Sequence, residues 1–123
     1  MRLVALLGCL LCTALRADAL TLHRYLDMAQ SSAKEEQALL NAYLVGLGEG
    51  FLWAEIHLSN ARGIRLYCQP DDRVLTEKDY REILERQIHH AKNAQFLQEI
   101  YERDIIGMLL LTGLQETFPC ETP

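Results

Sequence analysis

The four histidines of this 123-residue chain are the first side chains to test for metal or acid–base chemistry. His89 and His90 are adjacent, and adjacent side chains on a helix point about 100° apart, so they cannot hold one ion together. His23 and His57 have no cysteine or histidine at the spacing of a metal-binding motif. We therefore expect solvated histidines, no metal site and no cofactor.

Nucleophilic catalysis would need a free cysteine or an activated serine. Beyond residue 19, serine occurs only at Ser31, Ser32 and Ser59, at the expected ends of helices, and cysteine only at Cys68 and Cys120. The chain has no G-x-S-x-G motif and no glycine-rich phosphate loop. The sequence therefore predicts that the protein is not an enzyme.

Carboxylates are abundant, and two of them together can act as acid and base in a hydrolase. Most lie on the polar sides of expected helices, where Glu82 and Arg86 form an ordinary i,i+4 pair. Glu49 and Glu55 stand out because they flank Trp53 and a glycine-rich stretch. We favour a solvated role for the carboxylates, and catalysis by Glu49 and Glu55 is the minor alternative.

The first 19 residues have the pattern of a secretory signal peptide. Arg2 supplies the positive end, residues 3–15 carry no charge, and Ala17-Asp18-Ala19 matches the small-x-small cleavage pattern. The apolar run is shorter than the roughly 20 residues of a membrane-spanning helix. Cys9 follows a lipobox-like Leu6-Leu7-Gly8, but too few apolar residues precede it. We predict export through the Sec pathway to an oxidising compartment, with no membrane association after cleavage.

Removal of residues 1–19 leaves a single domain, 20–123, with a formal charge of −6 and two cysteines instead of four. The acidic balance argues against a nucleic-acid partner, which needs a basic face to neutralise phosphates. In an oxidising compartment, an even number of cysteines favours a disulfide. We predict a Cys68–Cys120 bond, which would stabilise a small domain by roughly 4 kcal/mol. Free or metal-binding thiols are the alternatives.

The domain has helical periodicity throughout. Leu22 to Ala29 predicts a short first helix with Thr21 as its cap. Ser32 and Glu35 form a capping-box signature for a second helix, which runs to about Asn60. Gly63 then fits the position just beyond a helix C-terminus.

One stripe of the second helix combines small and apolar residues at i, i+3, i+4 and i+7 spacing: Leu39, Tyr43, Gly46, Leu47, Gly50 and Ala54. Gly46 and Gly50 share a face, so the spacing predicts close approach of a neighbouring helix, with a kink as the alternative. We expect this face, with Phe51 and Trp53, to belong to the core, and a homodimer interface is the alternative.

A loop and two further helices complete the prediction. Residues 64–68 form at most a short extended segment, and residues 69–73 have the composition of a loop. Thr76 with Asp79 starts a third helix that reaches about Ala91.

Asn93 is the expected cap of a fourth helix, which carries Phe96 to Thr112 and stops at Pro119. The predicted fold is an all-α four-helix domain, or five helices with a short extra one, closed by one disulfide.

Four features, in this order, resemble the Rap/Tai-type immunity proteins of bacterial type VI secretion. They are the signal peptide, the glycine-rich centre of the second helix at residues 43–50, Tyr67-Cys68-Gln69-Pro70, and a closing helix that ends Phe118-Pro119-Cys120. The resemblance extends over residues 22–120. It implies an all-helical periplasmic protein with a Cys68–Cys120 disulfide, often dimeric, that binds and blocks a peptidoglycan amidase.

The family commonly has a His-Pro-Glu-like element where this chain has His90-Ala91-Lys92-Asn93-Ala94, and no inhibitory residue is carried over from it. Two polar segments are the candidate partner contacts: Gln69, Asp71, Asp72 and Arg73 in the loop, and His89, His90, Lys92 and Asn93 near the end of the third helix. The alternative function is a general periplasmic binding protein or acid-stress chaperone without a dedicated toxin.

Overall fold

The computed structural model describes residues 20–93, 103 and 105–121, and the predicted signal peptide lies outside the described residues. Its four described helices are α1 (Leu22–Gln30), α2 (Lys34–Arg62), α3 (Glu77–Asn93) and α5 (Ile106–Thr117). No strand occurs among these residues, including the 64–68 segment. The all-α prediction is therefore confirmed.

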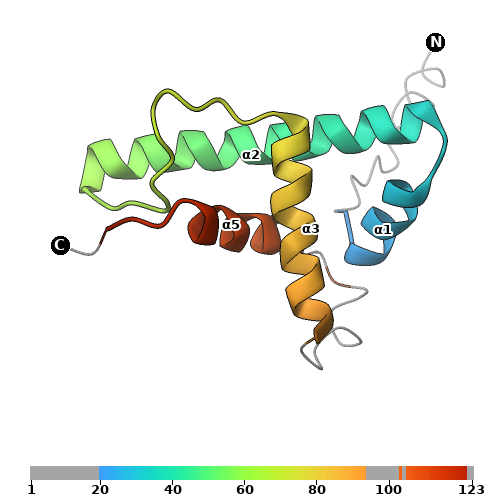
Figure 1. Cartoon of the computed structure of the whole chain (residues 1–123). Coiled ribbons are helices and arrows are strands. Elements are labelled where there is room, and N and C mark those ends of the chain that lie inside the picture. Colours follow the sequence, from blue (N-terminus) through green and yellow to red (C-terminus); the bar gives the residue numbers. More distant parts are fainter. Residues whose placement is uncertain (1–19, 94–102, 104, 122–123) are drawn as a thin grey trace, which may run out of the picture.

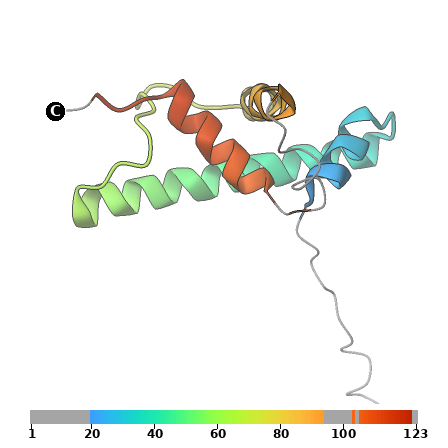
Figure 2. The same cartoon turned by 90° about the horizontal axis from the view of Figure 1, so that it is seen from below.

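The long helix α2 runs along one side of the molecule, and the other helices are arranged against it (Figure 1). α3 crosses α2 steeply, α5 lies beside α3, and α1 folds back near the start of α2. Figure 2, seen at right angles, shows α3 and α5 on the same side of α2. The opposite side of α2 is left without a covering helix among the described residues.

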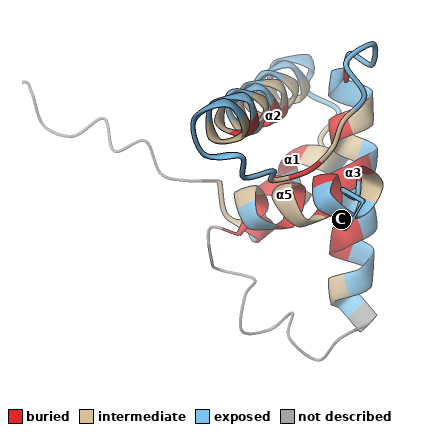
Figure 3. Ribbon diagram, turned by 90° about the vertical axis from the view of Figure 1, so that its left-hand side faces the viewer, coloured by how far each residue is buried: buried red, intermediate tan, exposed pale blue. Residues whose placement is uncertain are grey.

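The core forms where α2, α3 and α5 meet. Its fully buried side chains include Leu40 and Leu44 from α2, Leu84 from α3, and Leu110 and Leu114 from α5. In Figure 3 the buried residues lie on the sides of the helices that face one another, and the outer side of α2 is exposed along much of its length.

Two glycines allow the helices to approach closely at their crossings. A Cβ atom built on Gly48 would lie 2.3 Å from the Tyr80 ring, and one built on Gly113 would lie 2.5 Å from Ile83 Cγ2. Larger residues would therefore separate α3 from α2 and from α5.

The predicted packing face of α2 is correct only in part. Tyr43, Leu47 and Phe51 are half-buried against the core, but the other members of the face are not. No described atom lies within 4 Å of a Cβ built on Gly46 or Gly50, and Leu39 and Trp53 are 64% and 68% exposed. The helix is continuous from Lys34 to Arg62, so a break at the glycines is not the explanation. Both sides of α2 carry apolar and small residues at helical spacing, so the pattern did not identify which side faces the core.

Most predicted helix ends are confirmed. The Thr21 hydroxyl accepts a hydrogen bond from the Arg24 amide, and Gly63 has a left-handed φ of 66° at the end of α2. The Asp79 carboxylate accepts hydrogen bonds from the Thr76 amide at 2.8 Å and hydroxyl at 2.7 Å, which fixes the start of α3. These bonds lower the Asp79 pKa, with the backbone bond making the largest contribution.

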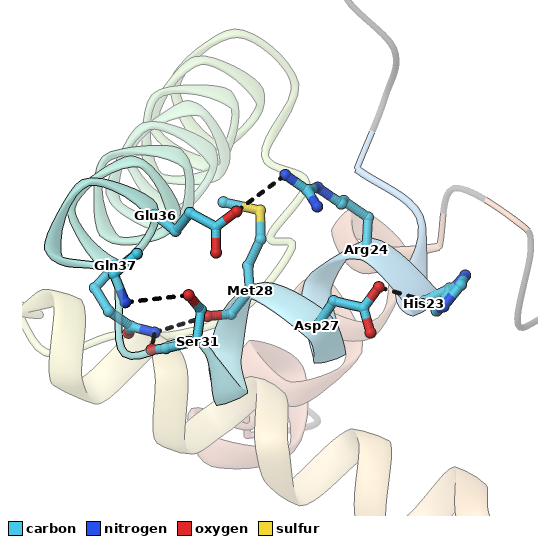
Figure 4. A network of polar contacts seen from close by, with 8 residues as sticks. His23, Arg24, Asp27, Met28, Ser31, Glu36 and Gln37 are labelled. Carbon is cyan, nitrogen blue, oxygen red and sulfur yellow. Dashed lines mark hydrogen bonds and ion pairs between the residues drawn. The ribbon is translucent and has the colours of Figure 1, made fainter.

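The capping box predicted from Ser32 and Glu35 does not form, because α2 begins one residue later with Ala33 as its cap. The corner between α1 and α2 is fixed instead by the Gln37 side chain. Its Nε2 donates to the carbonyls of Met28 (2.7 Å) and Ser31 (2.8 Å), as Figure 4 shows. An Arg24–Glu36 ion pair of 3.3 Å joins the same two helices.

The start of the last helix differs from the prediction. Asn93 is the last residue of α3, and the helix that it was predicted to cap would begin outside the described residues. Ile105 has non-helical backbone angles, and α5 begins at Ile106. The predicted helical residues 94–102 lie outside the described residues. The helix ends at Thr117, just before Pro119, as predicted.

Candidate partner-binding surface

The predicted Cys68–Cys120 disulfide is present, with a Cα–Cα distance of 5.0 Å. Beside it, the Cys68 amide donates to the Phe118 carbonyl at 2.8 Å. These two links join the chain that leaves α2 to the end of α5, so the segment between α2 and α3 is anchored in its middle. An anchored loop loses less conformational entropy when a partner binds it.

The predicted contact loop has internal bonds of its own. Gln69 Nε2 donates to the Arg73 carbonyl at 2.5 Å, and the Arg73 amide donates to the Pro70 carbonyl at 3.1 Å. The Arg73 guanidinium lies over the Phe118 ring, 5.2 Å from its centroid. Asp71 and Asp72 form the exposed turn between these contacts.

A groove of about 430 Å³ separates this loop from the second half of α2. Glu49 and Ile56 line it from α2, and Asp71 and Val74 line it from the loop. Val74 is 86% exposed, the highest value among the exposed large apolar side chains, and Ile56 is 40% exposed. We call Ile56, Gln69, Asp71, Asp72, Arg73 and Val74 the loop–groove surface.

Glu55, in the wall of the groove, is only 5% exposed. Its carboxylate accepts hydrogen bonds from Arg65 Nε and from the Leu66 amide. Each carboxylate oxygen therefore has a partner from the segment that follows α2. This arrangement holds the beginning of the loop against the helix, and it assigns Glu55 a structural role.

The tyrosines behind the groove are unsuited to proton transfer at neutral pH. Burial raises the pKa of Tyr67 to about 12, with smaller contributions from Tyr80 and Glu55. Burial also raises the pKa of Tyr80, assisted by the negative charge of Glu49. Both phenols remain protonated and neutral near pH 7, and in that form they complete the core beneath the loop.

The second predicted contact segment lies at the other end of α3. His89, His90 and Lys92 are exposed there, beside shallow depressions shared with Glu85. Asn93 ends the helix. A helix of 17 residues is about 25 Å long, so α3 separates this segment from the loop at its start (Figure 1). The structure does not bring the two predicted segments together.

The most exposed large apolar side chains among the described residues were not identified as contact candidates. Val74 lies one residue beyond the predicted loop contacts, and Leu39 and Trp53 were assigned to the core. A weak signal existed for Val74, because Val74 and Leu75 are adjacent apolar residues in a short connection, where both cannot face the core as easily as one.

Among residues 20–93 and 105–121, no three histidine, cysteine or acidic side chains are arranged to hold a metal ion. None of the described helices is both long and apolar enough to cross a membrane. The chain matches no protein-family model, no curated protein and no solved structure at a significant level.

Proposed function

We propose that this chain is a periplasmic immunity-type protein, without catalytic activity, that binds a peptidoglycan amidase and blocks it. The observation that supports this best is the loop–groove surface. There an exposed apolar residue, Val74, stands on a loop anchored by the Cys68–Cys120 disulfide. A rigid loop with an apolar tip can enter the cleft of an enzyme at a small entropic cost.

The charges around this surface favour a basic partner. Asp71 and Asp72 are exposed at the turn, and Glu49 contributes a third carboxylate to the groove. The Arg73 guanidinium lies over the Phe118 ring, so its positive charge is on the side of the loop that faces the end of α5. Complementary charge would mainly raise the association rate, and the apolar contact would mainly determine the lifetime of the complex.

The test is to mix the purified chain with small peptidoglycan amidases, beginning with any that a neighbouring reading frame encodes, and to measure peptidoglycan cleavage and the dissociation constant. We expect tight inhibition, and at least about tenfold weaker binding for Val74→Asp. Ile64→Asp is the matched control, because Ile64 is 49% exposed but does not line the groove. Full inhibition by Val74→Asp would reject the loop–groove surface, and no inhibition by the parent chain would reject the immunity function.

The second candidate is a general periplasmic binding protein or acid-stress chaperone. It is favoured by exposed apolar side chains at several places on the described surface, among them Leu39, Trp53 and Val74, which would suit varied unfolded clients. A chaperone should suppress aggregation of unrelated proteins at low pH, whereas an immunity protein should not. Broad suppression without inhibition of the amidase would favour this second function.

A further inference from the structure

The groove between the second half of α2 and the loop that follows it is lined by three carboxylates, of which only one is paired. Glu55 accepts hydrogen bonds from Arg65 and from the Leu66 amide, so both of its oxygens are occupied. Glu49 and Asp71 line the groove from opposite walls, and neither has an ion-pair or hydrogen-bond partner among the described residues. The groove therefore contains two negative charges that the described part of the chain does not pair.

The two arginines that line the groove make contacts elsewhere. Arg65 is paired with Glu55, and the Arg73 guanidinium lies over an aromatic ring at the end of α5, 5.2 Å from its centroid. Burial raises the pKa of the Tyr80 phenol, which also lines the groove, and the negative charge of Glu49 adds to the rise. The charge of Glu49 therefore acts on the interior of the groove, and a cation is the group that would pair with it.

The groove also has an apolar lining and a defined length. Leu52 and Ile56 line it from α2, and Leu75 lines it from the other side. From Glu49 to Asn60 it follows eleven residues of α2, which is about 16 Å. An extended chain spans that length with about five residues. The volume of about 430 Å³ lies in the range of pockets that hold small ligands, so a short extended segment of a partner has room in the groove.

We propose that the groove binds an arginine side chain, carried on an extended segment of the protein partner, between Glu49 and Asp71. A guanidinium group has five N–H donors in a planar fork, so one group can donate to carboxylates on both walls. The methylene stem of arginine suits the apolar lining, and a guanidinium is more weakly hydrated than the ammonium group of lysine. The proposal deepens the proposed function and rests on it only for the identity of the partner, so arginine binding can be tested without an amidase.

The first test adds capped five-residue peptides to the chain and follows its amide signals by nuclear magnetic resonance at low salt. The peptides carry arginine, lysine or citrulline between two valines, and citrulline has the shape of arginine without its charge. We expect the arginine peptide to shift signals of the groove residues. The citrulline peptide should bind at least about tenfold more weakly, and the lysine peptide about threefold more weakly. Equal binding of the arginine and citrulline peptides would overturn the proposal.

The second test removes the two unpaired carboxylates. Glu49→Gln and Asp71→Asn keep the size of each side chain, and each should raise the dissociation constant of the arginine peptide at least about threefold. The two together should raise it at least about tenfold. Glu85→Gln is the matched control, because Glu85 is exposed on α3 and does not line the groove. Circular dichroism verifies that the variants are folded. An unchanged dissociation constant for the double variant would overturn the proposal.

An inhibition assay separates this proposal from the proposed function. Against an amidase that the parent chain inhibits, the double variant Glu49→Gln/Asp71→Asn should inhibit at least about tenfold more weakly, and the arginine peptide should compete with the amidase. Full inhibition by the double variant would overturn the arginine site and leave the immunity function in place. Selective binding of the arginine peptide by a chain that inhibits no amidase would support the arginine site and reject the immunity function.

Discussion

The two sides of α2 are similar in composition and opposite in environment. Gly48 on the inner side lies so close to the Tyr80 ring that no Cβ would fit, whereas a Cβ built on Gly46, two residues earlier, has no described atom within 4 Å. Leu44 is fully buried, and Leu39 is 64% exposed. The same residue types therefore pack tightly on one side, and on the other they form an apolar surface that no described residue covers.

The difference shows that apolar periodicity identifies several helix faces that could be buried. Which of them is buried depends on where a neighbouring helix packs. The inner side has a complementary partner in α3, where Tyr80 lies over Gly48 and Ile83 lies over Gly113 of α5. Burial there stabilises the monomer by removing apolar area from water. The outer side buries little apolar area among the described residues.

The strongest test of the comparison pairs two leucines of α2. Leu44→Ala should destabilise the protein by about 2–5 kcal/mol, because the fully buried side chain leaves a cavity among packed neighbours. Leu39→Ala should change the free energy of unfolding by no more than about 0.5 kcal/mol, since its side chain is mostly in water. Urea unfolding followed by circular dichroism measures both, at a concentration where the protein is monomeric. Equal effects of the two substitutions would remove the distinction between the sides.

Replacing two glycines of α2 by alanine should change the stability by smaller amounts, and the two changes should have opposite signs. Gly48→Ala gains up to about 1 kcal/mol of helix propensity, but its Cβ would displace the buried Tyr80 ring, so we expect a net loss of about 1–2 kcal/mol. Gly46→Ala meets no described atom and should stabilise the monomer by about 0.5–1 kcal/mol. Thermal unfolding of the two variants gives the comparison. If Gly48→Ala stabilised the protein instead, α3 would have to move away from α2 at little energetic cost.

Features set by local chemistry could be predicted from the sequence. The cap at Thr21, the start of α3 at Thr76 and Asp79, and the left-handed Gly63 each depend on a few adjacent residues. The Cys68–Cys120 bond followed from counting cysteines after removal of the predicted signal peptide. The loop at residues 69–73 was also located correctly, because proline and paired aspartates favour turns.

Features that depend on distant neighbours could not be predicted. Gln37 replaced Ser32 as the residue that fixes the start of α2, because its side chain reaches carbonyls of α1. The role of Glu55 required knowing that residues 65–66 return to α2.

Removal of the Tyr80 hydroxyl should have the smallest effect on stability at neutral pH. It tests how well the inner side of α2 is closed to water. Burial raises the Tyr80 pKa above that of an unfolded tyrosine, near 10, so the folded state keeps a proton that the unfolded state releases. This contribution to stability is complete below pH 10 and is lost as the pH rises through the folded pKa. Tyr67, whose pKa is about 12, should act in the same direction.

Tyr80→Phe should therefore unfold almost like the parent chain at pH 8 and should lose less stability than the parent as the pH rises above 10. Urea unfolding at half-unit intervals of pH measures the two slopes, and Tyr67→Phe gives a second slope for the same core. If the parent and Tyr80→Phe have equal slopes, water reaches the Tyr80 hydroxyl in the folded state. The inner side of α2 would then be more accessible to water than the close approach of Gly48 and Tyr80 indicates, and the two sides of α2 would differ less in burial.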